Sequence, residues 1–275
     1  MSQVSRTSIK KVNADQISNA EDMLAAEEPM EIRLAYGPAD NRVQKNISVT
    51  MRTPDNDAEL AVGFLFTEAI ITSATDVQSV GYAKADNENI ILVSLAENVV
   101  PAIEKTERNF YTTSSCGVCG KASIEAVKTA CNIPESFDNL RVPASLIYRL
   151  PDRLRAHQDV FETTGGLHAC ALFDLTGKLL LSREDVGRHN ALDKLIGAAL
   201  NNGMIPLDNH ILLLSGRGSF ELVQKAVMAG IKIVAAVGAP SSLAAEMAEE
   251  WGMTLIGFLR GERFNIYSGA ERIVI

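Results

Sequence analysis

The sequence lacks several features that would place it in a specialised class of protein. Its 275 residues contain no run of roughly eighteen apolar side chains, so we expect no transmembrane helix. The opening stretch MSQVSRTSIKKVNADQ has no apolar core, which argues against a secretory signal and favours the cytosol. Basic residues number 26 against 34 acidic ones, and a net charge of -8 argues against binding to nucleic acid or a membrane surface.

Two common nucleotide-binding motifs are also missing. No G-x-x-x-x-G-K-[ST] occurs, which excludes a P-loop, and no G-x-G-x-x-G follows an apolar strand, which disfavours a Rossmann-type fold. Cysteine is scarce, with four residues in the chain. In a cytosolic protein these cysteines are more consistent with metal binding or thiol chemistry than with a disulfide framework.

The composition that remains is typical of a globular protein, with 47% apolar and 22% charged residues. The length allows two domains. We predict a flexible polar segment over 1–28, a smaller α+β domain over 29–140 and an α/β domain over 141–275. In the first domain, two strands around GPADN precede the helical stretch TPDNDAELAVGFLFTEAI, and the strands QSVGYAK and NIILVSLA follow it.

The second half alternates short apolar strands with amphipathic helices. LHACALFD and KLLLSRED predict a hairpin around Thr176-Gly177, and HNALDKLIGAALNNG predicts a helix that ends at Gly203. HILLLSG, IKIVAAVG and MTLIGFL read as strands, with helices between them. This rhythm predicts an α/β fold whose sheet is mixed but largely parallel, with helices on both faces.

Unusual loops follow four of these strands, over 182–190, 215–221, 238–244 and 258–265. In open α/β sheets, ligands bind at the carboxyl ends of the strands. Glycines in these loops allow backbone N–H groups to approach an anion, and helices that start near Ser219 and Ser241 direct their N-terminal dipoles to the same region. Five arginines can bind phosphate there: Arg183, Arg188, Arg217, Arg260 and Arg263. We therefore expect a site for a small phosphorylated ligand.

Other polar residues near these loops have two interpretations each. His168 follows Gly165-Gly166, and it either makes a structural hydrogen bond or lines the ligand pocket. His189 either caps a helix or contacts the ligand. Glu184 and Asp185 can accept hydrogen bonds from a nucleotide or a pterin, or can pair with the arginines instead.

The stretch TTSSCGVCGKASIE places Cys116 and Cys119 three residues apart among glycines. A structural zinc site needs two such pairs, and a deaminase-type zinc site needs an upstream H-x-E, so metal binding is disfavoured. A dithiol oxidoreductase needs its first cysteine at a helix N-terminus after a buried strand. The preceding RNFYTTSS is not an apolar strand, but this class remains open.

A persulfide carrier is the third interpretation of the two thiols. An exposed cysteine on a glycine-flanked loop accepts sulfur from a donor and offers it to an acceptor docked elsewhere. This interpretation uses both halves of the chain, because the arginine-rich loops can hold the acceptor. A non-catalytic chaperone that binds and delivers a cofactor is a further alternative.

Long segments of the chain resemble the FdhD family of formate dehydrogenase accessory sulfurtransferases. The resemblance runs from about residue 27 to about residue 268. It is carried by TPDNDAELAVGFLFTEAI, SSCGVCGKASIE, TGGLHACALF, REDVGRHNALDKLIG, LSGRGSFELVQKA, APSSLAAEMAEE and GFLRGERFNIYSG.

The resemblance implies a function that residue chemistry alone does not reach. It implies a sulfurtransferase that takes sulfur from a cysteine desulfurase as a persulfide. The sulfur is passed to the molybdenum of the bis-molybdopterin guanine dinucleotide cofactor, which then serves formate dehydrogenase. It also implies a homodimer, a cytidine-deaminase-like fold for the second domain and no resident metal.

The resemblance also implies roles for particular residues. Cys116 falls on the persulfide-bearing position, and Cys119 on a helper or relay thiol. Cys131 and Cys170 match no functional position and are expected to be small buried apolar residues. The cofactor-binding segment falls on Phe258, Leu259, Arg260, Gly261, Glu262 and Arg263. Further pocket residues are expected at Gly166, His168, Asp185, Arg188, His189 and Arg217.

Overall fold

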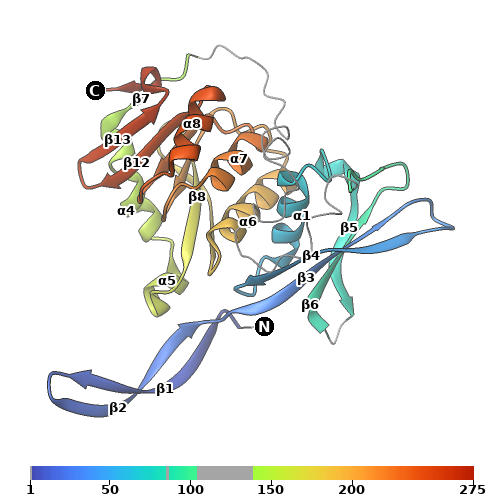
Figure 1. Ribbon diagram of the computed structural model, residues 1–275, viewed down its shortest axis with the longest axis horizontal. Helices are drawn as coiled ribbons and strands as arrows, with labels where there is room; N and C mark the ends of the chain where they lie inside the picture. The colour runs from blue at the N-terminus through green and yellow to red at the C-terminus, as the bar shows by residue number, and fades with distance from the viewer. Residues whose placement is uncertain (1, 85–86, 104–138) are drawn as a thin grey trace.

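The computed structural model describes residues 2–84, 87–103 and 139–275. In these residues a four-stranded sheet and a six-stranded sheet lie on either side of a layer of helices, and a two-stranded hairpin projects from the body (Figure 1). None of the described helices is both long and apolar enough to cross a membrane.

The four-stranded sheet belongs to the N-terminal part of the chain and has the order β4-β3-β6-β5. Its strands and its helix are β3 (Glu28–Tyr36), β4 (Val43–Arg52), α1 (Asp57–Thr67), β5 (Val77–Lys84) and β6 (Asn87–Leu95), with a 3-10 turn at Ala74–Asp76. The strands predicted on both sides of GPADN and those predicted at QSVGYAK and NIILVSLA are confirmed, and so is the helix between the two pairs.

The six-stranded sheet belongs to the C-terminal part and has the order β13-β12-β11-β10-β8-β9. Its strands are β8 (His168–Asp174), β9 (Leu179–Asp185), β10 (His210–Leu214), β11 (Ile233–Ala236), β12 (Thr254–Arg260) and β13 (Arg263–Ser268). The helices of this part are α3 (Ala144–Ile147), α4 (Leu150–Arg155), α5 (Asp159–Thr164), α6 (Arg188–Asn201), α7 (Phe220–Met228) and α8 (Ser242–Glu250). Two short strands, β7 (Val142–Pro143) and β14 (Ile273–Val274), pair beside it, and a 3-10 turn spans Ala270–Arg272.

The sheet is mixed, as expected, but the prediction that it is largely parallel is wrong. The pairs β10–β11 and β11–β12 are parallel, whereas β8–β9, β8–β10 and β12–β13 are antiparallel. Hairpins at both edges cause the difference, because strands joined by a tight turn must run in opposite directions. The alternation of strands and helices describes the middle of the sheet correctly and fails at its edges.

Alternating apolar residues bury both faces of the six-stranded sheet. Cys170, Leu172, Leu212 and Leu214 face the core that contains α1, α6, α7 and α8. Their neighbours Ala171, Phe173, Ile211 and Leu213 face a second core, formed with α3 and α4. A strand that is buried on both faces reads as a continuous apolar run, which is why HILLL and IVAA are recognisable in the sequence.

Helices α1 and α6 cross at direct backbone contact between the two sheets (Figure 1). A Cβ atom added to Gly63 of α1 would overlap the carbonyl oxygen of Asp193, and one added to Gly197 of α6 would overlap the carbonyl oxygen of Glu59. The two glycines therefore set the distance between the N-terminal and C-terminal parts of the molecule.

The N-terminal segment, predicted as flexible, forms a regular antiparallel hairpin of β1 (Val4–Asn13) and β2 (Gln16–Ala25). The hairpin extends away from the body, and both of its faces are largely exposed (Figure 1). Because neither face is buried, its strands do not alternate between apolar and polar residues, and the sequence gives no strand pattern there. Whether the hairpin moves stays a prediction.

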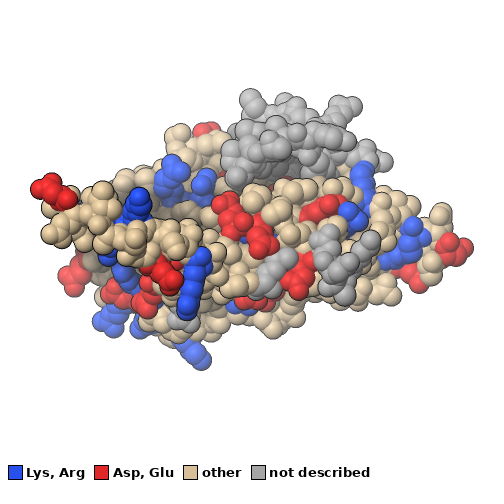
Figure 2. All heavy atoms as spheres, turned by 90° about the horizontal axis from the view of Figure 1, so that it is seen from below, with Lys and Arg blue, Asp and Glu red and all other residues tan. Residues whose placement is uncertain are grey.

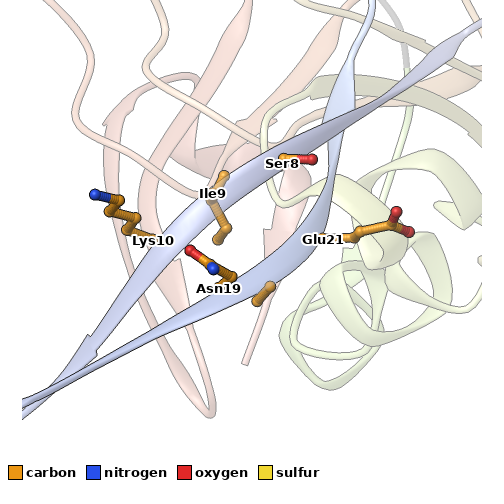
Figure 3. Close-up of a pocket in the computed structure, with 6 residues that line it drawn as sticks. Ser8, Ile9, Lys10, Asn19 and Glu21 are labelled. Atoms are coloured by element: carbon orange, nitrogen blue, oxygen red, sulfur yellow. The ribbon is translucent and has the colours of Figure 1, made fainter.

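An open hollow of about 660 Å³ lies on this hairpin, lined by Ser8, Ile9, Lys10, Asn19, Ala20 and Glu21 (Figure 3). Figure 3 shows Lys10 and Glu21 pointing away from each other on opposite sides of the twisted ribbon. The hollow therefore follows from the twist of the hairpin and does not bring chemical groups together.

Candidate functional site: an arginine-rich rim of the six-stranded sheet

The strand pairing gathers the predicted loops at one end of the six-stranded sheet. Leu214, the last residue of β10, lies opposite Ala236 at the end of β11 and opposite Cys170 near the start of β8. His168 at the start of β8 pairs with Asp185 at the end of β9. The loop after β12 reaches the same end, because β12 runs parallel to β11. We call this end, with the loops 165–168, 185–190, 215–221, 237–242 and 258–263, the rim.

Close backbone contacts hold the middle loops of the rim together. The N–H of Gly238 donates to the carbonyl oxygen of Gly216 at 2.9 Å, and the N–H of Ser241 donates to that of Gly218 at 2.9 Å. A Cβ atom on Gly238 would stand 3.0 Å from the backbone of Arg217. The glycines predicted to allow an anion to approach therefore also allow these two loops to pack against each other.

Three helices begin at the rim, namely α6 after Gly187, α7 after Ser219 and α8 after Ser241. Helix N-termini carry unpaired N–H groups and the positive end of the helix dipole, both of which favour anions. The Ser241 side chain accepts a hydrogen bond from the N–H of Ala244, whereas Gly187 and Ser219 make no side-chain cap bond. The rim thus combines three positive helix ends with its arginines.

Arginines at the rim differ in how free they are to bind a ligand. Arg217, Arg260 and Arg263 are exposed. Arg188 is partly buried, and within the described residues its buried Nε atom has no hydrogen-bond partner. Arg183 instead makes a two-pronged ion pair with Glu59 of α1, at 2.5 and 2.7 Å. The prediction that Arg183 serves the phosphate site is not supported, because its guanidinium already holds a carboxylate.

His168 lies among the positive groups of the rim. Burial lowers the pKa of its imidazole below the usual value, and the charges of Arg188, His189 and Arg217 lower this pKa further. The His168 ring is therefore uncharged near pH 7 and can both donate and accept a hydrogen bond. Its Nδ1 atom would lie 3.1 Å from a Cβ atom on Gly216, so a larger residue at position 216 would crowd the ring.

His189 links the starts of α6 and α7. Its Nε2 atom lies 2.9 Å from Oε2 of Glu221 and 3.2 Å from the hydroxyl oxygen of Ser219. Ser219 was expected as the start of a helix, whereas Glu221 was not singled out from the sequence. A signal for Glu221 was present, because an acidic residue in the first turn of a helix is favoured by the positive end of the helix dipole.

Asp185 differs from the other predicted pocket residues in its burial and in the number of its hydrogen bonds. It is fully buried, and its two oxygens accept hydrogen bonds from the backbone of Thr53 and Gly187, from the side chain of Asn190 and from Lys194. Glu184 accepts the N–H groups of Val160 and Phe161 at the start of α5. The contacts of Asp185 fit a group that holds the rim in place, and its role as a ligand contact stays a prediction.

The predicted cofactor-binding segment covers the end of β12, the turn at 261–262 and the first residue of β13. Phe258 is half exposed with φ of 53°, a left-handed conformation that is unusual for a bulky residue, and its N–H donates to the carbonyl oxygen of Gly238 at 3.0 Å. Leu259 is buried, whereas Arg260, Gly261, Glu262 and Arg263 are exposed. A pocket of about 240 Å³ lies here, lined by Phe258, Arg263, Phe264 and Asn265. This pocket thus combines an aromatic face with an arginine, which are groups that can contact a planar ring and an anion.

The remaining predicted residues are one glycine and the four cysteines. Gly166 is exposed in the loop before β8, with the side chain of Ala25 at 3.7 Å from a Cβ atom placed on it. Cys116, Cys119 and Cys131 lie outside the described residues. Cys170 is buried, and burial raises the pKa of its thiol above the usual value, so the expectation that it is a small apolar core residue is confirmed.

Comparison with known proteins identifies the family of this chain. The family model described as FdhD/NarQ family matches residues 25–274, which include the whole rim. The chain belongs to the FdhD/NarQ family. Two relatives are named "Sulfur carrier protein FdhD". The one from Streptomyces coelicolor is 49% identical over 98% of this chain and 95% of its own length. The one from Sulfurisphaera tokodaii is 42% identical over 99% of this chain and 100% of its own length.

A solved structure from Desulfotalea psychrophila has the same fold as this FdhD/NarQ chain. It is described as a putative formate dehydrogenase accessory protein, and it superposes with a TM-score of 0.75 over 99% of this chain and 100% of its own. Because the two sequences are 24% identical, this likeness shows the fold alone. The predicted α/β fold is confirmed, and its cytidine-deaminase-like character stays a prediction.

Proposed function

We propose that this protein carries sulfur as a persulfide on Cys116 and delivers it to a molybdenum cofactor bound at the rim. The names of its relatives support the first part, since two relatives named as sulfur carriers are 49% and 42% identical over 98% and 99% of this chain. Formate dehydrogenase, the enzyme implied by the resemblance of the sequence motifs, is proposed as the enzyme that receives the product. The proposed donor is a cysteine desulfurase, and the proposed setting is a homodimer in the cytoplasm.

The observation that carries the proposal is the gathering of anion-binding groups at the rim. Three helix N-termini, the exposed side chains of Arg217, Arg260 and Arg263 and the neutral ring of His168 lie at one end of the sheet. A dinucleotide cofactor carries phosphates for the arginines and a guanine ring for the exposed face of Phe258. The substrate at this rim would thus be the bis-molybdopterin guanine dinucleotide form of the cofactor.

Sulfur loading needs no external oxidant or reductant. The thiolate of Cys116 attacks the terminal sulfur of the desulfurase persulfide, a new S–S bond forms, and the donor cysteine leaves as its thiolate. Release of that sulfur as sulfide requires two electrons. Cys119 can supply them by attacking Cys116 to form a disulfide, which a cellular dithiol then reduces. A thiol-disulfide oxidoreductase would use the same pair without the bound cofactor.

The surface charge gives no broad positive field to attract an anion. On the face shown in Figure 2, basic and acidic side chains are interspersed. For a chain of net charge -8, binding of an anionic ligand has to rely on local groups such as the rim arginines and helix ends.

A guanine-nucleotide titration tests the proposed rim. GDP should bind the wild-type protein, and Arg260→Ala should weaken binding by about tenfold, the value of one charge-assisted contact of roughly 1.5 kcal/mol. Lys178→Ala is the matched control, because it removes an exposed positive charge at the opposite end of β8 and β9, roughly 20 Å along the strands. Equal GDP affinities for wild type and Arg260→Ala would show that the rim does not bind the nucleotide.

A further inference from the structure

Four residues connect the end of β4 to the rim, and we call them the latch: Thr53, Asp185, Asn190 and Lys194. They come from the chain just after β4, from the end of β9 and from α6. All four are buried, with exposed fractions of 1%, 0%, 9% and 1% respectively. The contacts of Thr53 with the other latch residues join distant parts of the sequence, since Thr53 lies 132 residues from Asp185 and 141 from Lys194.

Thr53 contributes three separate bonds to the latch. Its N–H donates to Oδ2 of Asp185 at 3.1 Å, and its carbonyl oxygen accepts from Nζ of Lys194 at 2.8 Å. Its hydroxyl oxygen accepts the N–H of Val186 at 3.2 Å. One residue of the N-terminal part thus binds the rim loop through both backbone and side chain.

Asp185 and Lys194 form the charged centre of the latch. Nζ of Lys194 lies 2.7 Å from Oδ2 of Asp185, while Oδ1 accepts the N–H of Gly187 at 2.7 Å and the side-chain amide of Asn190 at 3.1 Å. That amide also donates to the carbonyl oxygen of Met51 at 2.7 Å. Two buried charges remain acceptable only while each has its partner, so loss of one partner would release or distort this region.

The segment that the latch fixes carries two predicted ligand residues, Arg188 and His189. They occupy the first turn of α6, where Gly187 is the N-cap and offers no capping side chain. Asp185 instead holds the start of the helix by accepting the N–H of the N-cap residue Gly187 and the side-chain amide of Asn190 in the first turn. The orientation of Arg188 and His189 therefore depends on Asp185, and Asp185 depends on Lys194 and Thr53.

We infer that the latch positions Arg188 and His189 for the bound anion, so that Lys194, Asp185 and Thr53 are positioning residues of the rim. This inference rests on the proposed function for its ligand. It gives Asp185 a role through its neighbours instead of through direct contact with the ligand, and it makes the N-terminal sheet part of the binding apparatus.

The chain contains a matched control for a purely structural role. Asp193, beside Lys194 on α6, forms a second buried ion pair with Lys225, at 2.9 and 3.0 Å. Lys225 also contacts Thr67 and Glu68 near the end of α1, and it lies in the last turn of α7, away from the helix starts at the rim. Lys194→Met and Lys225→Met each remove one buried cation and leave one buried carboxylate.

Hydrogen–deuterium exchange and GDP titration on the full-length protein test the inference together. In Lys194→Met, the amides of Val186 and Gly187 should exchange faster than in wild type. GDP affinity should fall about tenfold, as it does when the binding-competent arrangement is populated about a tenth of the time. Lys225→Met should lower the melting temperature about as much as Lys194→Met does. It should nevertheless leave the exchange at 186–190 and the GDP affinity close to wild type.

Thr53→Val provides a second test of the latch that does not depend on whether Lys194→Met folds. It removes the hydroxyl that accepts the Val186 N–H at nearly constant volume, whereas Thr53→Ser keeps it. Faster exchange at Val186 and weaker GDP binding are expected for Thr53→Val, with rescue of both by Thr53→Ser.

The two ideas can fail separately. If wild type binds no GDP, the proposed ligand is wrong, and the exchange rates still decide whether the latch orders the rim. Unchanged exchange at Val186 and Gly187 in Lys194→Met and Thr53→Val overturns the inference. Faster exchange with unchanged GDP affinity overturns it too, because the ordered loop would then not serve the ligand.

Discussion

Gly63→Ala should destabilise this protein by about 3 kcal/mol or more, although alanine normally favours a helix over glycine by about 1 kcal/mol. The reason is steric. A methyl group at position 63 would overlap the carbonyl group of Asp193 and approach the backbone of Gly197, and backbone atoms cannot rotate away. The two helices would have to separate, opening the core on both sides of the contact.

Thermal unfolding measures this effect directly. For a chain of this size, a loss of about 3 kcal/mol corresponds to a fall of roughly 10 °C in melting temperature. Gly81→Ala is the control, because a Cβ atom at this exposed position meets nothing within 4 Å. Gly63→Ala combined with Gly197→Ala should cost less than the sum of the single changes, since both substitutions open the same crossing. A melting temperature for Gly63→Ala equal to or above wild type would show that the helices do not approach this closely.

Cys116→Ala should abolish the acceptance of sulfur from a cysteine desulfurase. Persulfide formation requires a nucleophilic thiolate, and alanine offers none. After incubation with a desulfurase and cysteine, intact-protein mass spectrometry should find one added sulfur atom on wild type and none on Cys116→Ala. The same preparations should show equal circular dichroism, so that the loss is chemical and not a loss of fold.

Cys170→Ala is the control for sulfur loading. Cys170 is buried and the pKa of its thiol is raised, so almost no thiolate is present near pH 7 and this variant should load as wild type does. Equal loading of Cys116→Ala and wild type would assign the sulfur to another residue. A stable Cys116–Cys119 disulfide with disulfide-reducing activity and no sulfur adduct would instead support the oxidoreductase alternative.

Local sequence patterns predict much of the α/β part of this fold. The strands HILLL and IVAA are short apolar runs, and glycines such as Gly177 and Gly203, at φ of 78° and 66°, mark the turn and helix end where they were expected. The rule that ligands gather at strand ends then places the loops around Arg217 and Arg260 together without knowledge of any contact. This prediction succeeds because the relevant information lies within each loop.

Partners that are distant in the sequence explain what the patterns miss. Arg183 was expected to bind phosphate, but it binds Glu59, which is 124 residues away. The latch residues Thr53 and Lys194 have no local signal, because a threonine after a strand and a lysine in a helix are common. Their roles follow from the packing of the two sheets around α1 and α6, which no short window of sequence contains.

Transfer of labelled sulfur from Cys116 to the cofactor tests the central claim most directly. The protein is loaded with isotopically labelled sulfur, separated from the desulfurase and mixed with bis-molybdopterin guanine dinucleotide, and the label on protein and cofactor is followed by mass spectrometry. Label should leave Cys116 and appear on the cofactor with wild type, and at a limiting cofactor concentration it should leave Cys116 about tenfold more slowly in Arg260→Ala. Label that remains on wild-type Cys116 in the presence of the cofactor, or that leaves Arg260→Ala equally fast, would contradict the central claim.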